Sequence, residues 1–185
     1  GLGDVYKRQT LYRIGSEGME LKNEVTNNSG LETIARVGQS FRLPAAFDTL
    51  TWYGKGPWET YADRKDAALI GLYTSSVAEQ HVPFAVPCEC GGHEDTRFAA
   101  LSDGTHTVQI VGSDDFHFSA LPYSIAEYRK ATYEEELPEQ TTGTWLILDV
   151  AHAGLGGDTG WTKNIHPEYR VCKGRYSYTF RFHFA

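Results

Sequence analysis

Apolar and polar residues alternate with a period of two along much of the chain. The clearest case is the final run, 175–184, where every second residue is aromatic: Tyr176, Tyr178, Phe180, Phe182 and Phe184. A helix would scatter these side chains around its circumference, whereas a strand places all five on one face. The pattern therefore predicts a strand whose aromatic face lies in the core.

Shorter runs of the same kind are separated by turn residues every ~8–12 positions, which is the spacing of all-β proteins. The predicted strands are Met19–Val25, Ile34–Leu43, Thr49–Gly54, Thr107–Gly112, Phe116–Ala120 and Thr144–Val150. One helix of two or three turns is predicted at Ile125–Thr132, with Ser124 as its N-cap, and a single turn at Asp63–Leu69. Since neither helix is long enough to form a layer, we expect a stack of antiparallel sheets with long loops.

Composition narrows the class of protein. The chain has 185 residues, which favours one domain, and its net charge of −7 argues against nucleic-acid binding. No apolar run approaches the ~18–20 residues that cross a bilayer, so no membrane span is expected. Residues 1–9 look like translated cloning sequence, which leaves 10–185 as the predicted domain. No signal peptide is visible and Cys88, Cys90 and Cys172 are predicted to be free thiols, so a cytoplasmic location is expected.

Three loops are longer than strand connection requires, at 54–64, 83–95 and 151–169, and long loops on a β scaffold often carry function. The last contains a glycine-rich run, 154–160, followed by Trp161 among polar neighbours. This Trp either offers a flat face to the C–H surface of a sugar or folds back to close the edge of the sandwich. The sequence alone leaves both open.

A second aromatic cluster runs from Trp52 to Arg64 around two glycines and a proline. Aromatic faces beside Glu59 and Arg64 are typical of a rim that binds polyols. The alternative is a plain turn closed by an ion pair from Arg64 to Asp63 or Glu59.

Cys88, Cys90 and His93 are possible metal ligands within a short segment. Their spacing matches no common closed zinc site, so the favoured interpretation is two cysteines that face a core and a solvated histidine. Whether these three residues bind a metal stays open, and no metal site is predicted.

The run Trp52–Arg64 resembles the WxGxGPxExYxDR signature of the C-terminal (small-chain, domain 5) β-sandwich of large bacterial β-galactosidases in glycoside hydrolase family 2. Later segments follow the family in order: 82–91, 118–124, 136–138, 146–149, 154–158, Trp161 and 176–182. The resemblance implies an all-β, galactose-mutarotase-like supersandwich. It also implies that the chain enters this domain part way and is N-terminally truncated.

The resemblance also implies a function. The domain supports the catalytic barrel of a β-galactosidase that hydrolyses terminal β-D-galactosides such as lactose, and it lends loops to the sugar site. It is not catalytic alone, because the catalytic glutamates belong to the barrel. The residues expected to bind substrate are Trp161, Asp158, Glu59 and Arg64. The expected partners are the rest of the chain and a galactoside, in a homo-oligomer. No cofactor is expected here, since Mg²⁺ and Na⁺ in the full enzymes are bound mainly by other domains.

Two alternatives remain. The domain could hold a carbohydrate by itself, as a stand-alone binding module. It could also be a mutarotase-like aldose epimerase, which needs a histidine and a carboxylate facing one sugar pocket as acid and base. His152 and Asp158 are the candidates for those roles.

Overall fold

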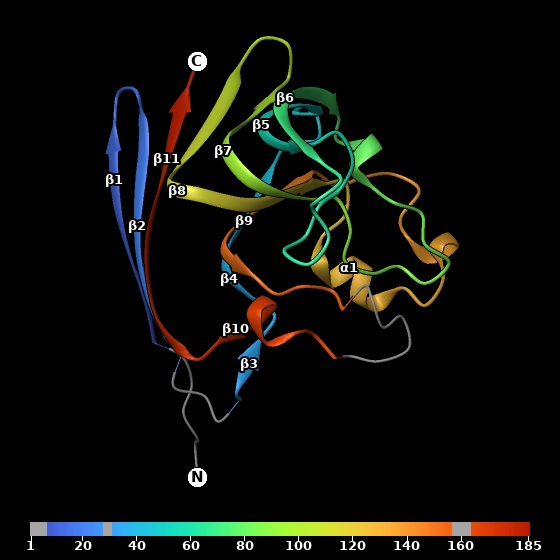
Figure 1. Ribbon diagram of the computed structural model, residues 1–185. Helices are drawn as coiled ribbons and strands as arrows, with labels where there is room; N and C mark the ends of the chain where they lie inside the picture. Colours follow the sequence, from blue (N-terminus) through green and yellow to red (C-terminus); the bar gives the residue numbers. More distant parts are fainter. Residues whose placement is uncertain (1–6, 28–30, 157–163) are drawn as a thin grey trace.

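The computed structural model describes residues 7–27, 31–156 and 164–185. Within them, nine strands form one antiparallel sheet (Figure 1). They are β1 (Lys7–Gly15), β2 (Gly18–Asn27), β4 (Arg36–Leu43), β5 (Thr49–Gly56), β6 (Leu69–Ser76), β7 (Gly92–Ser102), β8 (Thr107–Leu121), β9 (Thr144–His152) and β11 (Gly174–Phe184). Two short strands, β3 (Thr33–Ile34) and β10 (Val171–Cys172), pair separately.

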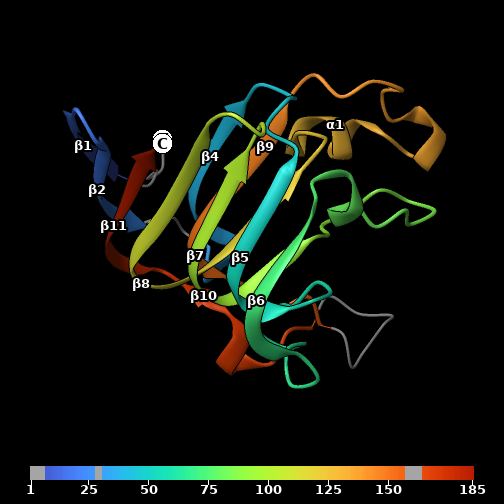
Figure 2. The ribbon, with the colours of Figure 1, turned by 90° about the horizontal axis from the view of Figure 1, so that it is seen from above.

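The sheet divides at the long strand β8. Its first half, 108–112, pairs with β11, whereas its second half, 117–121, pairs with β9. Strands β1, β2 and β11 therefore form one wall and β4 and β9 another, and both are joined through β8 (Figures 1 and 2). The walls meet at the core, where the rings of Phe41 on β4 and Phe182 on β11 lie 5.0 Å apart. This is a β-sandwich arrangement, as the sequence predicts.

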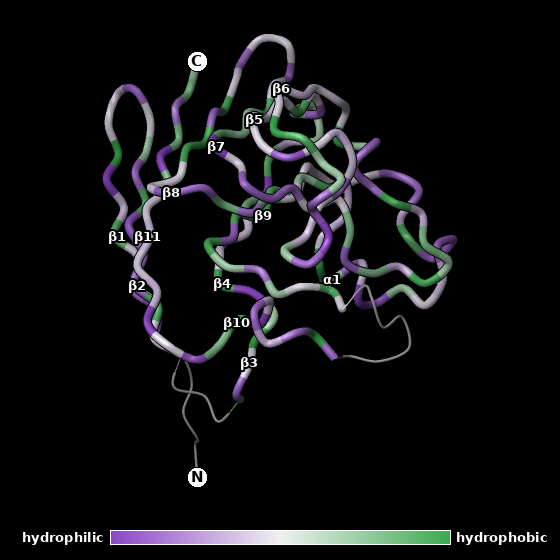
Figure 3. Tube along the Cα trace, viewed as in Figure 1, coloured by the Kyte–Doolittle hydropathy of each residue, from purple (hydrophilic) through white to green (hydrophobic). Residues whose placement is uncertain are grey.

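The aromatic face of β11 is confirmed. Tyr178, Phe180 and Phe182 are buried in the core, and Tyr176 packs against it. Phe184 is exposed because it lies at the end of the strand. The alternation of polar and apolar residues along β11 and the β1–β2 hairpin is visible in Figure 3.

The other predicted strands are found, with 107–112 and 116–120 joined in the single strand β8. Strands β1, β6 and β7 escaped prediction because polar residues and glycines interrupt their alternation. The turn predicted at Asp63–Leu69 is not helical: a bridge joins Tyr61 to Arg64, and β6 begins at Leu69. Residues 7–9 pair with 24–26 in the β1–β2 hairpin, while the predicted domain boundary stays a prediction.

The predicted helix forms as α1 (Ile125–Lys130). Ser124 caps it with a capping box, in which its side chain accepts from the Glu127 N–H and the Glu127 carboxylate accepts from the Ser124 N–H. Three 3-10 turns complete the described helices: η1 (Ala78–Gln80), η2 (Glu134–Glu136) and η3 (Pro167–Tyr169). In the described part of the chain, no helix has the length and apolar character to cross a membrane.

Candidate functional site

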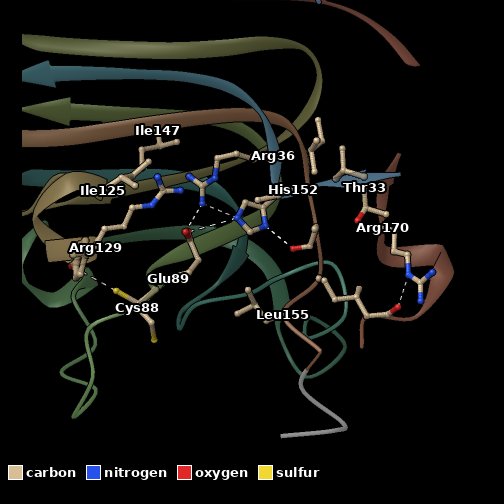
Figure 4. Close-up of a pocket in the computed structure, with 18 of the residues that line it drawn as sticks. Thr33, Arg36, Cys88, Glu89, Ile125, Arg129, Ile147, His152, Leu155 and Arg170 are labelled. Carbon is tan, nitrogen blue, oxygen red and sulfur yellow. Dashed lines mark hydrogen bonds and ion pairs between the residues drawn. The ribbon is translucent and has the colours of Figure 1, made fainter. Parts of the chain in front are cut away.

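A pocket of about 640 Å³ opens where the end of β9 meets β4 and the loop before β7. Figure 4 shows its charged side chains. It is lined, among others, by Arg36, Glu89, Arg129, His152, Leu155 and Arg170. Charged groups therefore come together from segments far apart in the sequence.

Arg36, Glu89 and His152 form the centre of the pocket. The Arg36 Nη2 group donates to His152 Nε2 at 2.8 Å and also pairs with the Glu89 carboxylate (Figure 4). His152 Nε2 lies 3.7 Å from Glu89 Oε1. Burial opposes ionisation of Glu89, but the neighbouring His152 and the charge of Arg36 outweigh burial and lower the pKa of Glu89 to about 2. Glu89 is therefore a carboxylate at neutral pH.

Behind this centre lie two buried residues, His117 and Asp149. The His117 ring stacks on that of His152, with centroids 4.4 Å apart, and its Nδ1 lies 2.8 Å from Glu94 Oε1. Burial lowers the pKa of His117 well below its ordinary value, so the ring is neutral. Burial raises the pKa of Asp149 to about 6, against the opposing charge of Arg36 3.5 Å away.

Asp63 joins two of the motifs found in the sequence. Its carboxylate accepts from the backbone N–H of Leu155 at 3.0 Å and of Gly156 at 2.6 Å. Gly154 permits this approach, because a Cβ there would lie 2.6 Å from Asp63 Cγ. The Trp52–Arg64 segment thus fixes the start of the glycine-rich loop that precedes Trp161.

Two of the four predicted substrate-binding residues, Asp158 and Trp161, lie outside the described residues. The other two, Glu59 and Arg64, form an ion pair, and Glu59 also accepts from the Gly91 N–H at 2.8 Å. They line a second, smaller hollow of about 500 Å³ beside Trp58. The ion pair matches the turn interpretation, and the assignment of both residues to substrate stays a prediction.

The aromatic residues of the Trp52–Arg64 segment divide into two groups. Trp52 and Tyr61 are fully buried, so they belong to the core and not to a binding rim. Trp58 and Tyr53 are exposed, at 62% and 40%, and of these two Trp58 lines the hollow with Glu59 and Arg64.

The structure does not bring Cys88, Cys90 and His93 together as ligands. Cys90 is buried against Tyr128, whereas Cys88 is exposed and does not face a core. The expected solvated His93 is wrong: it is fully buried, packs on Trp52 and shares a hydrogen bond with Gln80. Burial lowers its pKa to about 3.

Sequence reasoning missed Arg36, Glu89 and His117 as site residues. They stand singly, on three different segments, and no local motif links them. His152 was noticed only because it precedes the glycine-rich loop. The signal present in the sequence was Arg36, the single charged residue in the otherwise apolar run 34–37. A strand can bury such a charge only when the charge has a partner.

Comparison with solved structures defines the class of fold. The chain is similar to a putative aldose 1-epimerase from Escherichia coli K12, with a TM-score of 0.50, 10% identity, and coverage of 97% of this chain and 60% of that one. At this identity the likeness concerns the fold alone, and it is the galactose-mutarotase-like β-sandwich predicted from the sequence.

Sequence comparison then gives the family. The family model described as beta galactosidase small chain matches residues 3–182, so the chain belongs to this family. It is 36% identical to a beta-galactosidase of Priestia megaterium over 96% of this chain and 38% identical to one of Vibrio cholerae over 89%. It spans only 17% and 15% of the length of these two relatives.

Proposed function

We propose that this chain is the small-chain domain of a β-galactosidase, which supports the catalytic barrel and lends loops to the galactoside site. Hydrolysis itself is assigned to glutamates outside these 185 residues. The proposal rests on the family match and on relatives named beta-galactosidase that are about six times as long.

The observation that carries the sugar-binding role is the contact of the Asp63 carboxylate with the start of the glycine-rich loop, called the Asp63 anchor below. Two loops about ninety residues apart in sequence are held together by its hydrogen bonds to Leu155 and Gly156. One loop carries the exposed Trp58 and the Glu59–Arg64 pair, and the other leads to Asp158 and Trp161. Aromatic faces beside paired charges suit a sugar, which presents C–H surface and hydroxyl groups.

The test is a kinetic comparison in the complete enzyme. Trp161→Ala is expected to raise KM for lactose more than it lowers kcat, because stacking contributes about 0.5–1.5 kcal/mol, enough to change affinity without changing the chemistry. Tyr133→Ala, which truncates an exposed aromatic that does not line the pocket, is the control and is expected to leave both constants unchanged. An unchanged KM in Trp161→Ala would contradict the stacking role.

A titration separates the stand-alone alternatives. Under the proposal, galactose added to the 185-residue chain produces no saturable change in tryptophan fluorescence at low millimolar concentration. Saturable binding would instead favour an independent carbohydrate-binding module. Faster optical-rotation decay of fresh α-galactose would favour an epimerase. The Mg²⁺ and Na⁺ ions, the homo-oligomer and the cytoplasmic location belong to the same proposal about the complete enzyme.

A further inference from the structure

We propose that Glu89, His117 and His152 form a binding site for a zinc-class divalent cation, with two imidazoles and one carboxylate as ligands. One potential ligand atom from each residue lies within 4.8 Å of the other two. Glu89 comes from the loop before β7, His117 from β8 and His152 from the end of β9. Glu89 lies between Cys88 and Cys90, but the proposed site uses neither of these thiols and does not use His93.

His117 carries the strongest evidence. Its Nδ1 is taken by the Glu94 carboxylate, while its Nε2 is buried and has no hydrogen-bond partner among the described residues. Only 4% of the residue is exposed. An unpartnered nitrogen in a protein interior is costly, because water can no longer satisfy it. In the neutral ring with its proton on Nδ1, Nε2 presents a free electron pair.

His152 presents its electron pair in the same way. Its Nδ1 lies 2.7 Å from the carbonyl oxygen of Ala153, and a carbonyl can only accept, so Nδ1 carries the proton. Nε2 then carries the electron pair, which accepts from Arg36 Nη2 at 2.8 Å, and it lies 3.7 Å from Glu89 Oε1. Metal-ligating histidines almost always donate their other N–H to a carboxylate or a backbone carbonyl. His117 and His152 do this through Glu94 and Ala153.

Arg36 holds the place that the cation would take. Its Nη2 group donates to His152 Nε2 and pairs with Glu89, so it must withdraw when a metal binds. A second carboxylate is available to receive it. Both oxygens of Asp149 and the Nη1 of Arg36 lack hydrogen-bond partners in the described structure, although Nη1 and Oδ2 are only 3.5 Å apart. A small shift toward Asp149 would bring Nη1 within hydrogen-bond distance of Oδ2.

The donor set selects the metal. Two imidazole nitrogens and one carboxylate oxygen suit Zn²⁺, whereas Mg²⁺ prefers oxygen ligands. Tetrahedral bonds of about 2.1 Å place ligand atoms about 3.4 Å apart, close to the 3.7 Å between His152 Nε2 and Glu89 Oε1. The Glu89 side chain is about one third exposed and lines the pocket, so it can move inward and a water can take the fourth position.

The test uses the 185-residue chain with Cys88→Ser and Cys172→Ser, which removes the exposed thiols. Calorimetric titration with Zn²⁺ is expected to show one ion per chain, and Co²⁺ is expected to give the visible absorption of a four-coordinate site. Glu94→Gln removes only the hydrogen-bond partner of His117, so it should weaken Zn²⁺ binding by roughly 10–100-fold. His117→Gln and Glu89→Gln each remove a proposed ligand, so each should weaken Zn²⁺ binding by more than Glu94→Gln does. His106→Gln, an exposed histidine paired with Asp103, is the matched control and should bind as the parent does.

Thermal unfolding without metal shows whether each variant folds. The parent protein supplies an independent measurement, because Zn²⁺ must shift the imidazole ¹⁵N resonances of both His117 and His152. Absence of saturable Zn²⁺ binding would overturn the proposal. So would unchanged affinity in a folded His117→Gln variant, or shifts confined to other histidines.

Discussion

The Asp63 anchor gives the sharpest test of how the loops are built. Asp63→Ala removes the acceptor of two backbone hydrogen bonds, to the N–H groups of Leu155 and Gly156. Hydrogen bonds to a charged group contribute about 1.5–3 kcal/mol each. Because the bond to Leu155 is exposed, we take the lower part of that range and expect a loss of about 2–3 kcal/mol in the local opening free energy of this loop.

Amide hydrogen exchange measures this loss directly. A change of about 2–3 kcal/mol predicts exchange faster by about 30- to 150-fold at Leu155 and Gly156, with amides of the core strand β11 unaffected. Asp66→Ala removes the same charge from an exposed neighbour on the same loop and serves as the control. Exchange as slow as in the parent would refute the anchor.

Gly154 supplies a second test of the same contact. In Gly154→Ala the new Cβ would lie 2.6 Å from both Cγ and Oδ2 of Asp63, so the two groups must move apart. The variant is expected to lose the same protection. Combined with Asp63→Ala it should lose less than the sum of the two single effects, because the clash disappears with the carboxylate. Strict additivity would show that the two residues act independently.

Three further predictions concern stability. Phe180→Ala should lower the free energy of unfolding by about 3–5 kcal/mol in urea titrations, since this fully packed ring leaves a cavity; a loss below about 1 kcal/mol would contradict its place in the core. Ser124→Ala should cost about 1 kcal/mol by removing the cap of α1, whereas Thr105→Ala, on an exposed turn, should change little. The pKa of His93, about 3 when folded, lies below its unfolded value of 6.5, so its contribution to stability is present above pH 6.5 and is lost as pH falls toward 3, by up to about 5 kcal/mol. His93→Phe should flatten this part of the pH–stability curve, and an unchanged slope would contradict the assignment.

Local pattern was enough to predict most of the sheet and helix α1. The alternating aromatics of β11 and the Ser124–Glu127 capping box act over a few residues, so the sequence displays them directly. β7 escaped prediction because its first residues, 92–97, are polar yet partly or fully buried by contacts from other strands. β7 forms because it pairs with β5 and β8, and the local sequence pattern does not show this pairing.

The charged site is a matter of tertiary contact. Arg36, Glu89 and His117 meet only because β8 joins the β4–β9 wall to the strand that follows the Cys88–Cys90 segment. The spacing of residues within any one of these segments does not indicate that the three side chains come together. The contact of Asp63 with the glycine-rich loop is also a tertiary contact. The sequence shows the two motifs, but it does not show that Asp63 of one motif binds the backbone of the other.

The central claim is that this chain is a required but non-catalytic part of a β-galactosidase. The most direct measurement is lactose hydrolysis by this chain, by the remainder of its enzyme, and by the two mixed. The account predicts no turnover from this chain alone, little from the remainder, and activity on mixing. Turnover by the isolated chain, or full activity of the remainder without it, would contradict the account.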